Sequence, residues 1–138
     1  FPVRVTGAPS GRVLVTFAGP GSASVLAAQW DPSDGWSGPV TVTGAASYVN
    51  DWSVAMDPSG QAILVWTRSA GPGALGDGVR AALLASDGTW SAPGWLSREA
   101  TPDGHARLAA MDDGTALAVW SEVTTGRKLA VMARSYVV

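Results

Sequence analysis

The sequence contains one unit written three times, and this internal repeat limits the folds open to the chain. The segment Arg12-Val-Leu-Val-Thr-Phe17 aligns with Gln61-Ala-Ile-Leu-Val-Trp66 and with Thr115-Ala-Leu-Ala-Val-Trp120, at offsets of 49 and 54 residues. Each copy follows a turn of Pro, Ser, Asp and Gly, and the third turn counts one residue fewer than the others. A period of about 50 residues indicates stacked copies of one supersecondary unit.

Each repeat is predicted to fold as four short β-strands. In the second repeat they cover about residues 51–56, 61–67, 78–85 and 89–97, which are rich in Val, Leu, Ile, Trp and Thr. The second strand is apolar on both faces and should be buried on both. No stretch of helical length shows a helical period of apolar residues. Four strands in about 50 residues are typical of one β-propeller blade.

The predicted fold is therefore all-β, a partial β-propeller of about three blades of four antiparallel strands each. Blade 1 is expected at about residues 1–44, blade 2 at about 45–98, and blade 3 at about 99–138, without its outer strand. Residues 3–7 are interpreted as an inner strand. The alternative is a closing outer strand, because residues 2–7 resemble residues 39–44.

The ends of the chain bear on its expected partners. It starts at Phe1 and stops inside an apolar stretch, so a fragment of a longer protein or a processed chain is expected. Three blades leave two open sheet faces. We expect the remaining blades of a longer chain, or a second copy in a homodimer, to close the ring.

One turn of the second repeat carries a resemblance. Ser86-Asp87-Gly88-Thr89-Trp90 resembles a shortened Asp-box, the repeat motif of sialidase-like propellers, and Asp34-Gly35-Trp36 is a poorer copy. The resemblance implies the blade type, and it implies that the box is a structural turn on the face away from the binding site. A sialidase site would also need three converging Arg, a Tyr with a Glu partner and an Asp acid. The sequence around such residues is not recognisable here, so catalysis is not expected of this chain.

Composition excludes several function classes. Charged residues make up 14% of the chain, the net charge is -2, and there is no basic stripe for nucleic acid. The longest unbroken apolar runs are five residues, too short to span a membrane. With one His and no Cys, a zinc site of the usual kind is not expected, and no cofactor or metal is predicted.

The binding face is predicted from the loops. The turns after first and third strands are short and repeated, whereas the connections after second and fourth strands differ from unit to unit. Function concentrates on variable loops held by a rigid scaffold. The ligand-binding candidates on that face are Tyr48, Asn50, Asp51, Trp52, Arg68, Asp103, His105 and Glu122.

The tryptophans divide in the same way. Trp36, Trp66, Trp90 and Trp120 recur at repeat positions and are predicted to pack between blades. Trp52 is predicted to be partly exposed and available to stack on a sugar ring.

The predicted function is a non-catalytic binding or scaffolding module with a glycan or protein ligand, and carbohydrate is favoured. We expect it in a secreted or cell-surface bacterial protein. The alternatives are a segment of a sialidase-like glycoside hydrolase and a purely structural part of a larger propeller.

Overall fold

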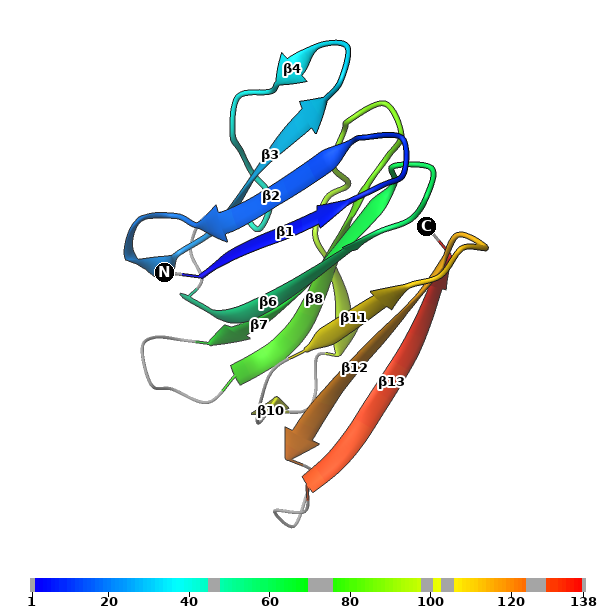
Figure 1. The fold of residues 1–138 in the computed structure, drawn as a ribbon. Coiled ribbons are helices and arrows are strands. Elements are labelled where there is room, and N and C mark those ends of the chain that lie inside the picture. The colour runs from blue at the N-terminus through cyan, green and yellow to red at the C-terminus, as the bar shows by residue number, and fades with distance from the viewer. Residues whose placement is uncertain are drawn as a thin grey trace.

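The structure is a computed structural model that describes residues 2–44, 48–69, 76–97, 101–102, 106–123 and 129–137. These residues form three antiparallel β-sheets that spread like a fan (Figure 1). The all-β class predicted from the repeat is confirmed. Among the described residues, no helix is long and apolar enough to cross a membrane.

Sheet 1 is built from the first repeat. β1 pairs antiparallel with β2, from Val3 opposite Phe17 to Gly7 opposite Val13, so residues 3–7 form the first strand of this sheet. β3 pairs with β2 and carries the two short strands β4 and β5 on its other edge. A 3-10 turn, η1 (Pro20–Ser22), connects β2 to β3. The strands are β1 (Val3–Gly7), β2 (Val13–Ala18), β3 (Val25–Asp31), β4 (Gly35–Trp36) and β5 (Val40–Thr41).

Sheet 2 follows the predicted four-strand pattern. Its order is β6-β7-β8-β9, and its strands are β6 (Tyr48–Met56), β7 (Ala62–Ser69), β8 (Gly76–Leu84) and β9 (Gly94–Ser97). The fourth strand is shorter than predicted, because only an isolated bridge between Leu84 and Trp90 precedes β9. Pro93 lies between that bridge and β9 and has no N–H to donate to a ladder.

Sheet 3 is built around a long central strand. β12 (Thr115–Val123) pairs with β11 (Arg107–Ala110) on one edge and with β13 (Leu129–Val137) on the other. The short β10 (Thr101–Pro102) pairs with the far end of β12. In the described part of sheet 3, no strand pairs with the outer edge of β13.

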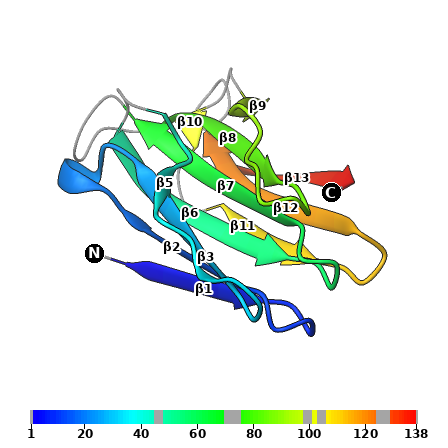
Figure 2. The same cartoon turned by 90° about the horizontal axis from the view of Figure 1, so that it is seen from above.

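The three sheets meet along β1, β6 and β11. β6 lies between β1 and β11 in both views (Figure 1, Figure 2). One apolar core lies between sheets 1 and 2 and contains Leu14, Leu64 and Trp66. A second core lies between sheets 2 and 3 and contains Ile63 and Trp120. Successive residues of β7 therefore enter alternate cores, which confirms that this strand is buried on both faces.

Four turns share one geometry and lie at the same end of the sheets. In each, the first residue donates its N–H to the fifth residue, and the glycine at position four donates to the first. That glycine has φ between 81° and 89°, a conformation that other residues rarely adopt. The turn before the third repeat, which contains Gly114, therefore has the same length as the turns before the first two repeats. The shorter turn predicted there from the sequence is wrong. The glycines are Gly11, Gly60, Gly88 and Gly114.

Candidate functional site

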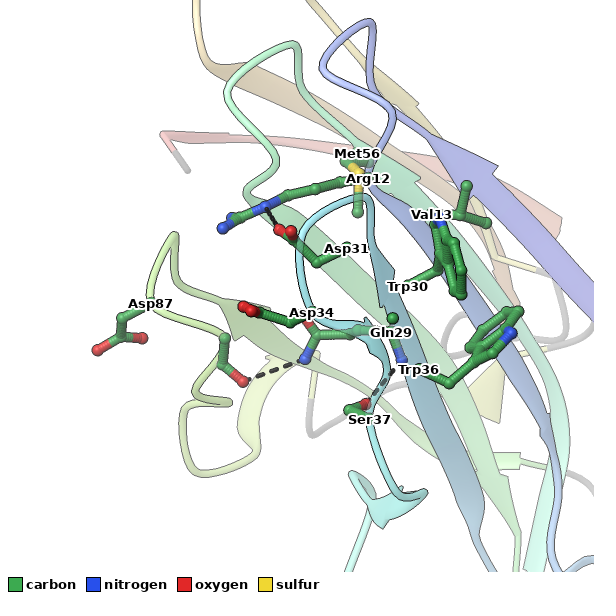
Figure 3. A pocket seen from close by; sticks show the side chains of 12 residues that line it. Arg12, Val13, Gln29, Trp30, Asp31, Asp34, Trp36, Ser37, Met56 and Asp87 are labelled. Atoms are coloured by element: carbon green, nitrogen blue, oxygen red, sulfur yellow. Dashed lines mark hydrogen bonds and ion pairs between the residues drawn. The ribbon is translucent and has the colours of Figure 1, made fainter.

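A hollow of about 320 Å³ lies at the turn end of the molecule, where sheet 1 meets sheet 2 (Figure 3). We call it cleft 1. Its walls come from the β3–β4 hairpin, from the start of β2, and from the end of β6 and the turn at Gly88 in sheet 2. It is lined by Arg12, Val13, Gln29, Trp30, Asp31, Asp34, Gly35, Trp36, Ser37, Met56, Asp87 and Gly88.

The side of cleft 1 that faces sheet 2 is polar. The Arg12 guanidinium donates from Nε to Asp31 Oδ2 at 2.9 Å and from Nη1 to the Ser86 carbonyl at 2.8 Å. Gln29 Nε2 donates to the Gly88 carbonyl at 3.1 Å. These bonds hold a turn of sheet 2 against sheet 1. Asp34 is exposed, and no hydrogen-bond partner for its carboxylate is found within the described part of the chain.

The other side of cleft 1 is aromatic. Trp30 and Trp36 lie directly opposite each other on β3 and β4, with ring centroids 5.6 Å apart and ring planes at 59°. Their side chains are 37% and 58% exposed. Neighbouring residues of a strand point to opposite faces, so the rings lie across the β3–β4 hairpin from Gln29 and Asp31 (Figure 3).

Sheet 2 carries a counterpart of cleft 1, a hollow of about 310 Å³ that we call cleft 2. Ser37 donates its N–H to the Gln29 carbonyl and accepts the Gln29 N–H; Ser91 makes the same two bonds with Leu83. The two hollows are therefore one feature of the repeat. Cleft 2 has Leu83, Leu84 and Ala85 where cleft 1 has Gln29, Trp30 and Asp31. Only cleft 1 combines exposed indole rings with charged groups.

Two turn carboxylates of cleft 1, those of Asp31 and Asp87, are held in the ionised form. Ser33 donates both its N–H and its hydroxyl to Asp31 Oδ1, at 2.9 and 2.8 Å. These two bonds, with the Arg12 guanidinium as a further cause, lower the pKa of Asp31 from 3.8 to about 2. The hydroxyl and the N–H of Thr89 lower the pKa of Asp87 in the same way.

This geometry predicts an acid-sensitive set of turns. A carboxylate with a lowered pKa stabilises the fold above its unfolded pKa of 3.8, and this contribution is lost as the pH falls toward about 2. In a carboxyl chemical-shift titration by NMR, Asp31 is expected to titrate near 2, and Ser33→Ala to move that midpoint toward 3.8. Ser37→Ala is the control and should leave the midpoint in place, because Ser37 bonds the Gln29 backbone. An unchanged midpoint in Ser33→Ala would contradict the assigned cause.

The residues predicted from the sequence lie at the opposite end of the sheets. Tyr48 and Arg68 are half-buried beside the exposed Asn50, whose Oδ1 accepts a hydrogen bond from the Ser69 hydroxyl at 2.9 Å. Glu122 is buried in sheet 3 and accepts the indole N–H of Trp120 at 2.6 Å. The structure thus brings Tyr48, Asn50 and Arg68 to one end of sheet 2, and a binding role for this end stays a prediction. Asp103 and His105 lie outside the described residues.

Asp51 on β6 connects all three sheets, through β1 of sheet 1 and β11 of sheet 3. Its carboxylate is 7% exposed and accepts Arg4 Nη2 of sheet 1 at 3.1 Å and Arg107 Nη1 of sheet 3 at 2.7 Å. A group held in this way stabilises the arrangement of the sheets and is poorly placed to receive a ligand. The described residues contain no group of three or more His, Asp or Glu side chains arranged to hold a metal ion.

Two predictions about the tryptophans are wrong. Trp52 is 3% exposed, and its indole N–H donates to the Thr16 hydroxyl at 2.9 Å, because β6 points this side chain into the core between sheets 1 and 2. It cannot stack on a sugar ring. Trp36 is exposed rather than packed between sheets, because no sheet formed by the described residues covers that face of sheet 1. Trp66 and Trp120 are core residues, as predicted, and Trp90 packs half-buried against the first core.

No protein-family profile and no curated protein sequence matches the chain. Among solved structures, it is similar to the Hadza microbial sialidase Hz136, with a TM-score of 0.62 and 15% identity. This match covers 97% of the chain but 34% of the sialidase, so the chain spans about a third of that protein. It is also similar to a fucose lectin from Kordia zhangzhouensis in complex with methyl-fucoside, with a TM-score of 0.57 and 16% identity, over 99% of this chain and 97% of the lectin. The fold is therefore a partial β-propeller of three antiparallel sheets.

Proposed function

We propose that this chain is a non-catalytic β-propeller module that binds carbohydrate through cleft 1. The observation that carries the proposal is the exposed Trp30–Trp36 pair, on the hairpin whose opposite side carries the ionised Asp31 carboxylate. An exposed indole offers a flat apolar surface to the C–H face of a sugar ring. Carboxylates accept hydrogen bonds from sugar hydroxyls, and the Asp34 carboxylate has no partner among the described residues. The fucose lectin adds support, because its chain has the same fold over nearly its whole length.

The Asp31 and Asp87 carboxylates of cleft 1 favour binding over glycoside hydrolysis. A hydrolase needs a general acid whose pKa is raised, so that the group holds a proton near neutral pH. Hydrogen bonds from Ser33 and Thr89 lower the pKa of Asp31 and of Asp87 instead. These groups suit the acceptance of hydrogen bonds and not the donation of a proton to a leaving group. We propose, from the sequence alone, that the module belongs to a secreted or cell-surface bacterial protein.

The test is glycan binding by the purified chain and its variants. A panel of methyl glycosides that includes methyl-fucoside is titrated by calorimetry, and the best ligand is kept. Trp36→Ala is expected to weaken its binding about tenfold, equivalent to about 1.4 kcal/mol, because the stacking surface is lost. Asp34→Ala is expected to weaken it as well. Val40→Ala alters an exposed valine outside the cleft lining and should have no effect.

Two results would contradict the proposal. Binding that survives Trp36→Ala and Asp34→Ala but is lost in Asn50→Ala would move the site to the variable loops. A folded wild-type chain that binds none of the glycosides would remove carbohydrate as the ligand class.

A further inference from the structure

In sheets 2 and 3, the face that looks toward the preceding sheet is closed. In sheet 2 this face carries Leu64, Trp66 and Leu84, which are 0%, 1% and 1% exposed against sheet 1. In sheet 3 it carries Ala118 and Trp120, which are 0% and 4% exposed against sheet 2. The same interface therefore occurs twice in one chain.

The corresponding face of sheet 1 is uncovered. Trp30 stands where sheet 2 has Leu84, because each lies opposite the first residue of its second strand. Trp36 likewise stands where sheet 2 has Trp90. The exposed fractions on this face are 58% for Val3, 65% for Val5, 37% for Trp30 and 58% for Trp36. No charged residue occurs at these positions, so an apolar face is left without its neighbour.

The face of sheet 3 that points away from sheet 2 is uncovered as well, as far as the described residues go. In sheet 2, Ile63 and Val65 face sheet 3 and are 0% exposed. Their counterparts in sheet 3, Leu117 and Val119, are half-exposed. Val131 lies opposite Ser121 on the same face and is 75% exposed. The outer faces of sheet 1 and sheet 3 therefore differ from each other. The outer face of sheet 1 corresponds to the face of sheet 2 that packs on sheet 1. The outer face of sheet 3 corresponds to the face of sheet 2 that packs on sheet 3.

We propose that a second copy of this chain occupies these faces, so that sheet 3 of each copy packs on sheet 1 of the other. The contact continues the series of interfaces between sheets 1 and 2 and between sheets 2 and 3. Propellers close with about four to eight blades. One chain supplies three sheets, two chains supply six and three chains supply nine, so two copies give a ring of ordinary size. Contacts between two different faces of identical chains form a closed ring when the rotations that relate successive copies add up to a full turn.

The second copy would also complete the wall of cleft 1, and this step rests on the proposed function. Trp30 and Trp36 lie on the face that the partner covers. In the ring, a sugar on Trp36 would lie beside sheet 3 of the second copy.

The solution mass of the purified chain tests this proposal, measured by light scattering during size-exclusion chromatography. The wild type is expected near 28 kDa, twice the chain mass of 14.1 kDa. Val5→Lys and Val131→Lys each place a charge on one of the two faces and should give the monomer mass. Both valines are exposed, so the fold should survive, and circular dichroism checks it. Val40→Lys is the matched control: this exposed valine lies opposite Ala27, which faces sheet 2, and the variant should remain a dimer.

A mixture of the two monomeric variants sharpens the test. In a ring of one Val5→Lys copy and one Val131→Lys copy, both lysines meet at one interface while the other interface is unaltered. The mixture should therefore regain part of the 28 kDa species. A folded wild-type monomer, a series of undefined larger masses, or a dimer that survives both lysines would each overturn the proposal. Mass and glycan binding are separate readouts, so failure of the ring is distinguishable from failure of the proposed function.

Discussion

Trp52→Ala is expected to lower the free energy of unfolding by about 3–5 kcal/mol, the usual cost of removing a large buried aromatic side chain. Trp52 is 3% exposed and packs in the core between sheets 1 and 2 beside Trp66 and Leu14. Its indole N–H also holds the buried Thr16 hydroxyl of sheet 1 at 2.9 Å. The variant loses apolar contacts, leaves a cavity between two sheets and removes the donor to Thr16.

Urea unfolding at one fixed protein concentration measures this loss, because association of the chain would make stability depend on concentration. Trp52→Phe keeps much of the ring and removes the N–H, so a smaller loss of about 1–3 kcal/mol is expected. Val40→Ala is the exposed control, because Val40 lies outside cleft 1 and outside the faces proposed to meet a second copy, and it should cost less than about 1 kcal/mol. A loss below about 1 kcal/mol in Trp52→Ala would contradict the burial of this side chain.

Asp51→Ala is expected to lower the free energy of unfolding by about 2–3 kcal/mol. The Asp51 carboxylate accepts hydrogen bonds from both Arg4 of sheet 1 and Arg107 of sheet 3, at 3.1 and 2.7 Å. Hydrogen bonds to charged groups contribute about 1.5–3 kcal/mol each. The two arginine side chains are 40% and 58% exposed, so water screens their charges and weakens both ion pairs. The expected loss of stability therefore lies at the low end of this range.

The same unfolding experiment separates Asp51 from its partners. Asp51→Asn keeps the shape and removes the charge, and it should recover part of the loss. Arg107→Ala alone should cost about 1 kcal/mol or less, because its side chain is exposed and Arg4 still pairs with Asp51. Equal stability of Asp51→Ala and the wild type would show that this network does not hold the three sheets together.

The strand plan could be predicted because it is local. The strands expected at about 51–56, 61–67 and 78–85 correspond to β6, β7 and β8 within a few residues. The turn before the third repeat counts one residue fewer in the sequence when Ala55-Met56-Asp57 is aligned with the identical tripeptide Ala110-Met111-Asp112. Hydrogen bonding places Met111 at the position of Asp57, since each donates its N–H to the fifth residue of its turn. A shift of one residue in a strand turns every side chain to the other face, so such an error changes which residues appear buried.

The sequence analysis does not identify cleft 1, although the sequence contains a signal that points to it. The loops that differ most between repeats directed attention to the end of the sheets that holds Asn50 and Arg68. Cleft 1 lies at the other end, in turns that repeat and were therefore interpreted as structural. The replacement of Leu83, Leu84 and Ala85 by Gln29, Trp30 and Asp31 at equivalent positions is visible in the printed sequence once the repeats are aligned through their hairpins.

The sequence alone determined the all-β class, the threefold repeat, the four-strand unit and the positions of the turns. These follow from apolar residues and glycines whose effects reach only their near neighbours. The tertiary structure alone decided which tryptophans are buried. Trp36 and Trp90 occupy the same position of the repeat, yet one is exposed and the other packs on a core. The difference arises because sheet 1 packs on the face of sheet 2 that carries Trp90, whereas none of the described sheets packs on the face of sheet 1 that carries Trp36. The burial of a side chain depends on the sheet that packs against it.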